Sequence, residues 1–312
     1  MNDIYIGSYL YPPVFLRPLG EDMVSAAEII DELLIDDFMI VITKMGGLFT
    51  TLPIELIGER IGENGHILST HLENQLNYEQ RICDYINLFI CELSLIGEYK
   101  QPITPAYLGI GKRKENLLIT EVTGGAPSAF PDRVFGPAIH TMDKNLFYYS
   151  MRTIVDEYEE AKKLLFVEKL RRVSMKLPLF IASAFSEYSQ HQLEESLIDA
   201  WVACEQLINH YWKTLLQMIV NNERKNRLKD ERTYSSAIKL EVLYSSKIFT
   251  EEIYNSLQIA RKHRNKLIHN TTIDYYAVME TFEALQGIIE LYTGYVIKQL
   301  PSSSGPLWFY KP

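Results

Sequence analysis

Hydrophobic and polar residues change their spacing along the chain, and the change separates two regions. In the first region, short runs of β-branched and aromatic residues at 4–10 and 38–43 predict strands. Apolar residues at helical spacing predict one helix over residues 22–36 and a second over residues 73–95. Three shorter runs punctuated by Gly and Pro predict further strands at residues 106–110, 117–123 and 133–139. The pattern is that of a mixed α/β domain.

From about Asn145 onward, the spacing of apolar residues is helical almost without interruption. One helix is expected to carry Pro178 in its first turn, where the missing N–H costs little, and Thr250 is expected to cap another. The remaining helices are predicted over residues 191–220, 234–247 and 274–300, with a polar loop at residues 221–233. We therefore predict an α+β protein, with a mixed α/β domain at residues 1–145 and an all-α bundle at residues 146–312.

The charge of the two regions also differs. Residues 1–150 hold ten Lys and Arg against twenty Asp and Glu, whereas residues 151–312 hold twenty-one against twenty. An acidic first region is a poor surface for polyanions, while the second region can hold a local basic patch. No basic segment precedes an apolar run at the N-terminus, and no apolar run is long enough to span a bilayer, so we expect no membrane partner. The three scattered cysteines indicate reduced core residues in a cytoplasmic protein.

The strongest candidate for chemistry is the segment 261–269, which reads RKHRNKLIH. Residues four apart share one face of a helix, so Arg261, Asn265 and His269 are expected to lie on one side. The long side chain of Arg264 can reach the same place. Two apolar residues of the segment are expected to face inward, Leu267 and Ile268. An Arg, an Asn and a His are thus predicted to converge near a helix end, on a basic patch.

Arg264-Asn265-x-x-x-His269 resembles the R-x4-6-H motif of HEPN domains, in which Asn or another polar residue commonly follows the Arg. HEPN domains of the Apea-like kind also carry a Trp-x-x-x-Glu pattern on a long helix, which Trp201 and Glu205 match. A middle helix, the helix that closes in the motif and one further helix are expected in the same order. The resemblance covers about residues 175–300 and does not extend to the first region.

The resemblance implies a metal-independent endoribonuclease without a cofactor, because many proteins of this family have that activity. RNA supplies its own nucleophile, the 2′-hydroxyl, and His269 is the candidate acid or base that moves the proton. Arg264 is the candidate that stabilises the charged phosphorane, since a planar guanidinium suits its equatorial oxygens. Asn265 is expected to hold the phosphate or to fix the tautomer of His269. The expected products carry a 2′,3′-cyclic phosphate and a 5′-hydroxyl, and DNA should be inert.

Neighbouring charged residues have two readings each. Arg261, Lys262 and Lys266 either contact RNA or form a solvated face. Glu205 is either an acid at the core edge that is salt-bridged to an Arg, or a polar member of the cleft. His263 is expected to be an exposed bystander.

Other residues of the second region are expected to be structural. Trp201, Cys204 and Met218 are predicted to lie in the core. The basic residues of the predicted loop are expected to be solvated, with a smaller chance of guiding RNA: Arg224, Lys225, Arg227 and Lys229. Trp212 is expected to be an exposed apolar residue on the long helix, where it would help to join two copies of the chain.

Cleavage needs both a base and an acid, and one histidine does not readily supply both. The resemblance implies a homodimer whose two motifs share one cleft, which provides two histidines. It also implies a role in prokaryotic antiphage defence or in a toxin–antitoxin system, with the first region as a sensor or a selector of RNA. Two alternatives remain open. The chain is a non-catalytic HEPN-fold subunit for interaction or ligand binding, or it is a toxin whose motif is silenced by an antitoxin partner, such as a nucleotidyltransferase.

Overall fold

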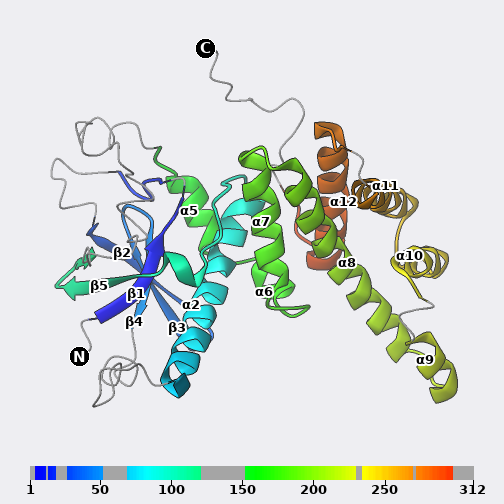
Figure 1. Ribbon diagram of the computed structural model, residues 1–312, viewed down its shortest axis with the longest axis horizontal. Helices are drawn as coiled ribbons and strands as arrows, with labels where there is room; N and C mark the ends of the chain where they lie inside the picture. The colour runs from blue at the N-terminus through cyan, green and yellow to red at the C-terminus, as the bar shows by residue number, and fades with distance from the viewer. Residues whose placement is uncertain are drawn as a thin grey trace, which may run out of the picture. The chain divides into compact units, whose positions relative to one another are not determined.

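The computed structural model describes residues 4–11, 13–18, 27–51, 69–120, 152–229, 234–269 and 272–297 (Figure 1). The chain divides into two compact units. The first comprises Met1–Ile90 with Lys100–Lys163, and the second comprises Cys91–Tyr99 with Leu164–Pro312. The boundary predicted between residues 145 and 146 lies outside the described residues, as do the strand predicted at 133–139 and most of the first half of the helix predicted over 22–36.

The first unit contains a six-stranded antiparallel sheet with the order β2-β3-β4-β1-β5-β6. Its strands are β1 (Ile4–Tyr9), β2 (Ile29–Ile35), β3 (Phe38–Thr43), β4 (Gly47–Thr51), β5 (Gly109–Lys114) and β6 (Leu117–Thr120). The strands predicted at 4–10 and 38–43 are confirmed, and β6 forms within the one predicted at 117–123. The run predicted as a strand at 106–110 begins instead with the 3-10 helix η2 (Pro105–Tyr107), and β5 follows it.

The helix predicted over residues 22–36 is wrong where the structure describes it, because residues 29–35 form strand β2. Asp36, with a φ of 57°, and Asp37 make a two-residue turn that brings β2 back onto β3, so that Leu33 lies opposite Ile40. Side chains of a strand alternate between its two faces, which leaves Leu34 58% exposed.

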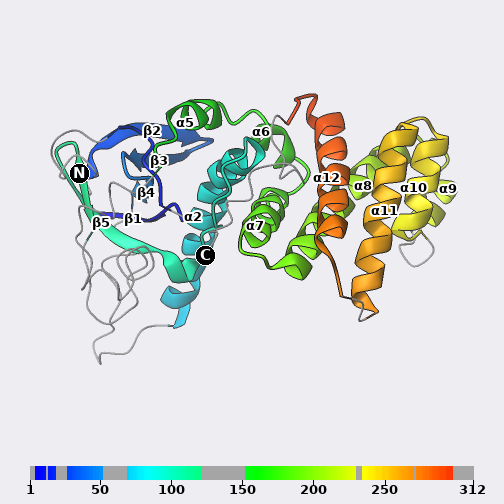
Figure 2. The same cartoon turned by 90° about the horizontal axis from the view of Figure 1, so that it is seen from above.

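Helix α2 (Ser69–Leu95) confirms the helix predicted over residues 73–95 and lies beside the sheet in the first unit as far as Ile90 (Figure 2). Ile82, Ile86 and Phe89 on this helix are fully buried. Asn87 is buried as well, and its amide is paired in both directions with the backbone of Ile103, at 2.9 and 2.8 Å. The helix therefore places an apolar face and one satisfied polar group in the core of the first unit.

The central strands approach so closely at Gly7 that no side chain fits there. A Cβ atom at this position would lie 2.1 Å from the carbonyl oxygen of Leu48 and 2.6 Å from the Cα of Phe49, both on β4. Short helix α5 (Val155–Ala161) completes this unit with Tyr158, which is fully buried and donates a hydrogen bond to Asp31 of β2 at 3.2 Å.

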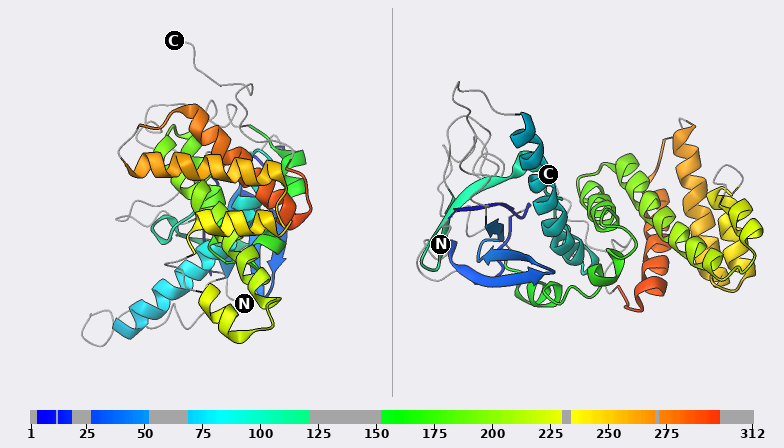
Figure 3. Two further views of the ribbon diagram at one scale, coloured as in Figure 1. Left: turned by 90° about the vertical axis from the view of Figure 1, so that its right-hand side faces the viewer. Right: turned by 90° about the horizontal axis from the view of Figure 1, so that it is seen from below.

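The second unit is helical, which confirms the α+β fold class. Its described helices are α6 (Val167–Leu170), α7 (Leu177–Ser189), α8 (Leu193–Gln217), α9 (Asn222–Leu228), α10 (Ser236–Ser245), α11 (Glu251–Ile268) and α12 (Tyr275–Thr293). The long helix α8 packs against α7, α10, α11 and α12 (Figure 3). Pro178 lies in the first turn of α7, and the Thr250 hydroxyl accepts a hydrogen bond from the N–H of Ile253 at the start of α11, both as predicted.

Two boundaries in this unit differ from the prediction. The segment predicted as a loop at 221–233 contains α9, whose first N–H groups are capped by Asn221 through a 2.9 Å hydrogen bond from Arg224. Helix α12 ends at Thr293 instead of residue 300, because Gly294 adopts a left-handed conformation with a φ of 72° and its N–H bonds to the carbonyl of Glu290.

Burial corrects several side-chain predictions and confirms others. Trp201 and Cys204 are in the core as predicted, and Cys83, Cys91 and Cys204 are free and buried. Met218, predicted to be core, is 71% exposed, because α8 ends at the preceding residue. Trp212, predicted to be exposed, is only 5% exposed. Within the described part of the chain, no helix has the length and apolar character needed to cross a membrane.

Candidate functional site

Helix α11 carries the predicted motif, and its first half explains how the motif is held. Thr250 caps the helix, and Glu251 and Glu252 in the first turn complement the partial positive charge of the helix start. Leu257 and Ala260 are fully buried and fix the rotation of the helix. The charged residues after Ala260 therefore have defined directions.

Arg261, Arg264 and Asn265 line one pocket of about 160 Å3, together with residues of two other helices. The pocket, called the Arg264 pocket below, is completed by Trp201 and Glu205 of α8 and by the first residues of α10, Ser235, Ser236 and Ala237. Side chains far apart in the sequence thus meet between α8, α10 and α11. The structure brings together Arg264, Asn265, Arg261 and Glu205 from the predicted site residues.

Hydrogen bonds hold the polar groups of the Arg264 pocket in place. Arg264 donates from Nη1 to Oδ1 of Asn265 at 3.2 Å, and Arg261 donates from Nε to Oε1 of Gln258 at 3.0 Å. Glu205 accepts a hydrogen bond from the hydroxyl of Ser236. Glu205 is therefore a polar member of the pocket wall, paired with a hydroxyl.

The pocket has the character of an anion site with one acidic wall. The planar guanidinium of Arg264 keeps further N–H groups beyond the one bonded to Asn265, and Arg261 adds a second guanidinium. Helix α10 begins at the pocket, and the side chain of its N-cap residue Ser235 makes no capping hydrogen bond. The N–H groups and partial positive charge of the helix start therefore add to the two arginines. A phosphate group suits such a set of donors.

His269 does not line the Arg264 pocket. It is the exposed C-cap residue of α11, and its backbone N–H lies 3.3 Å from the carbonyl of Asn265 and 3.1 Å from that of Lys266. The backbone hydrogen bond to Asn265 keeps His269 one helical turn beyond it, at the helix end as predicted, but the pocket lining does not include His269. The role predicted for His269 beside Arg261 and Asn265 therefore stays a prediction. Lys262 and Lys266 are also exposed and lie outside the pocket.

Two neighbours of the motif differ from the prediction. His263 was expected to be exposed, but its side chain is only 15% exposed and Nε2 lies 2.5 Å from Oε2 of Glu280 on α12. It joins two helices and is not free for chemistry. Ile268, expected to face inward, is 51% exposed because it lies in the last turn of α11.

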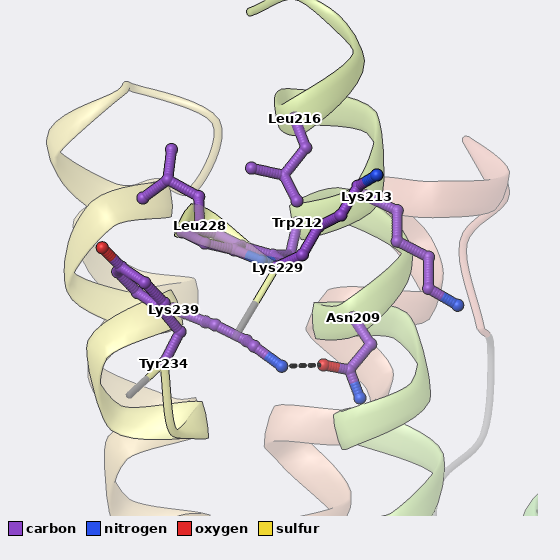
Figure 4. A pocket seen from close by; sticks show the side chains of 8 residues that line it. All are labelled: Asn209, Trp212, Lys213, Leu216, Leu228, Lys229, Tyr234 and Lys239. Atoms are coloured by element: carbon purple, nitrogen blue, oxygen red, sulfur yellow. Dashed lines mark hydrogen bonds between the residues drawn. The ribbon is translucent and has the colours of Figure 1, made fainter. Parts of the chain in front are cut away.

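A second pocket lies further along α8 and was not predicted from the sequence. Figure 4 shows the side chains that line it. The pocket holds about 140 Å3 and is called the Trp212 pocket below. It is lined by Asn209, Trp212, Lys213, Leu216, Leu228, Lys229, Tyr234 and Lys239. The sequence signal was present in the aromatic and basic residues, but they come from three separate helices and the linking segment. Only the packing of α8 against α9 and α10 shows that they meet.

Comparisons with known proteins give no match, whether with protein-family models, with curated proteins or with solved structures. The functional argument therefore depends on the residues and geometry of this chain.

Proposed function

We propose that the chain is a HEPN-type endoribonuclease that cleaves RNA without a metal ion. The observation that carries the proposal is the Arg264 pocket, in which Arg264 and Asn265 meet the start of α10 in an arrangement suited to a phosphate.

The proposed reaction is a transesterification within the RNA strand. The 2′-hydroxyl oxygen attacks the neighbouring phosphorus, the bond to the 5′ oxygen breaks, and a 2′,3′-cyclic phosphate and a 5′-hydroxyl result. One group must accept the proton of the 2′-hydroxyl and another must give a proton to the leaving 5′ oxygen, and an imidazole suits either role. Arg264 stabilises the negative charge on the phosphorane oxygens. Asn265, which binds Nη1 of Arg264, holds this guanidinium in place.

His269 is assigned the proton transfer, and this assignment requires a second copy of the chain. The exposed imidazole at the end of α11 lies outside the Arg264 pocket of its own protomer. A two-fold pairing through this end of the bundle would bring two His269 and two Arg264 side chains into one cleft. One histidine would then act as base and the other as acid. The homodimer is part of the proposal for this reason.

The biological role that fits this activity is the arrest of growth by cutting RNA, in prokaryotic antiphage defence or a toxin–antitoxin system in the cytoplasm. The first region carries a net charge of −10 over residues 1–150, so it is a poor RNA platform. We assign it to sensing a trigger or to binding a protein partner such as an antitoxin.

The experiment that tests the function is cleavage of total RNA by the purified full chain in the presence of EDTA. We expect wild-type cleavage without added metal, and a loss of about 100-fold or more in both Arg264→Ala and His269→Ala. Two substitutions serve as controls and should leave the rate unchanged. Arg172→Ala removes an exposed arginine that follows α6, and His191→Asn replaces an exposed histidine with a φ of 60° by a residue that tolerates this conformation. Cleavage that requires metal, or that survives His269→Ala, would contradict the proposal.

A second candidate is a non-catalytic HEPN-fold subunit that binds an anionic ligand. The observation that favours it is the position of His269 outside the Arg264 pocket, which leaves a phosphate-sized site without an imidazole in the single chain. The same variants separate the two functions. A binding subunit would keep its RNA affinity in His269→Ala, lose it in Arg264→Ala, and cleave nothing.

A further inference from the structure

The Trp212 pocket combines an aromatic surface with cationic groups. The ring centroids of Trp212 and Tyr234 lie 5.5 Å apart with an interplanar angle of 31°, and Leu216 and Leu228 add apolar wall on the side away from Lys239 (Figure 4). The two rings are too close for a third ring to enter between them. A planar ligand would therefore pack against them. The volume of about 140 Å3 is far below the range of about 300–1,000 Å3 typical of drug-sized ligands, so it suits one small ring system.

Lys239 places a buried positive charge at one end of this pocket. The residue is 8% exposed, and its ammonium donates to Oδ1 of Asn209 at 2.7 Å (Figure 4). A buried ammonium is usually paired with a carboxylate, yet none of the described lining residues is acidic. Among the described lining residues, the charge of Lys239 is thus met by a neutral amide oxygen. A ligand with hydrogen-bond acceptors on its edge would complete this arrangement.

We propose that the Trp212 pocket is a nucleobase subsite for the RNA substrate, and that it favours guanine over adenine. The ligand identity rests on the proposed function, since RNA is taken as the substrate. The base packs against Trp212 and Tyr234, as bases stack on aromatic side chains in single-strand binding proteins. Lys239 and the amide nitrogen of Asn209 donate to the two acceptors of guanine, O6 and N7. Adenine presents an amino group beside N7 and cannot satisfy both donors.

The position of the subsite fits a strand that also occupies the Arg264 pocket. Glu205 in the Arg264 pocket and Asn209 in the Trp212 pocket are four residues apart on α8, about 6 Å along the axis at 1.5 Å per residue. Tyr234 and Ser235, which line the two pockets, are adjacent in the sequence. A phosphate held by Arg264 therefore leaves a nearby base within reach of Tyr234. Exposed Lys213 and Lys229 at the rim can meet neighbouring phosphates.

The test is a binding measurement that does not depend on cleavage. Fluorescence anisotropy follows short labelled oligouridylates that carry one guanosine, one adenosine or one abasic residue, bound to the full chain with His269→Ala. We expect the guanosine strand to bind most tightly. Tyr234→Leu should weaken its binding by about tenfold and leave the abasic strand unaffected. Tyr234→Phe keeps the ring and should retain the affinity, whereas Lys239→Met should abolish the preference for guanine over adenine.

The matched control is Tyr244→Leu, which removes a tyrosine of α10, the helix that follows Tyr234, and this tyrosine stacks on Tyr254 outside the pocket. It should leave all three affinities unchanged. Equal binding of the guanosine and abasic strands by the parent chain, or an equal effect of Tyr234→Leu and Tyr244→Leu, would overturn the subsite. Metal-free cleavage with no base preference would leave the nuclease standing without the subsite. A guanine preference without cleavage would support the subsite and contradict the proposed nuclease.

Discussion

At the scale of single residues, the clearest electrostatic feature is the raised pKa of the Glu187 carboxyl on α7. Burial, with Asp199 and Glu195 nearby, raises the pKa of its carboxyl from 4.5 to about 7, and its Oε2 is buried without a hydrogen-bond partner among the described residues. Because the pKa is higher in the folded chain than in the unfolded one, the folded chain holds the proton more tightly. The contribution of Glu187 to stability is therefore fully present below pH 4.5 and is lost as the pH rises towards 7.

We predict that Glu187→Gln removes this loss. At pH 8 the variant should have a free energy of unfolding about 1 kcal/mol higher than wild type, a value reduced for partial solvent screening. Below pH 4.5 the difference should vanish. Urea unfolding at both pH values measures it, with Glu194→Gln, at an exposed position of α8, as the control. A difference that is equal at both pH values would show that Glu187 is not the titrating group.

The sequence predicted residues of the candidate site only where they lie close together on one helix. The four-residue spacing placed Arg261 and Asn265 on one face, and both line the Arg264 pocket. His269, one turn further on, is the C-cap residue of α11 and does not line this pocket. The hydrogen bond between Ser236 and Glu205 depends on the packing of α10 against α8, which no local pattern in the sequence reports. Tertiary contacts thus decided which charged residues are part of the pocket.

At the scale of elements, the sheet depends on the close approach at Gly7. We predict that Gly7→Ala lowers the free energy of unfolding by about 2–3 kcal/mol, because the new methyl group meets the backbone of β4. Gly109→Ala on the neighbouring strand β5 is the matched control, since the nearest atom to its Cβ would lie 4.0 Å away. Thermal and urea unfolding compare the two variants. Equal effects would show that the cost comes from replacing glycine and not from the clash.

Elements with a strong hydrophobic period were predicted well, and elements without one were not. Helix α2 and strand β3 follow from their own residues. Strand β2 was predicted as a helix because its apolar residues fit both periods, and the turn at Asp36 decides between them. Helix α9 has no buried residue, so it has no apolar stripe to read and depends on the cap at Asn221.

At the scale of the whole molecule, the proposed activity requires two chains to bring their motifs together. We predict that a spin label at Lys266→Cys gives a short distance between copies in a homodimer, which is lost on dilution with unlabelled chain. Lys266 is exposed on α11, while Cys83, Cys91 and Cys204 are buried and free, so the label should react at one place. A monomer in solution, or a dimer with widely separated labels, would contradict the shared cleft.

The most direct measurement of the central claim is the chemistry of the ends that cleavage leaves. The full chain is incubated in EDTA with an oligonucleotide that contains one ribonucleotide in a DNA strand, and the products are identified by mass spectrometry. The account predicts a single cut after the ribonucleotide, with a 2′,3′-cyclic phosphate on one product and a 5′-hydroxyl on the other, and no cut in an all-DNA strand. Products with 3′-hydroxyl and 5′-phosphate ends, or cleavage of the all-DNA strand, would contradict it.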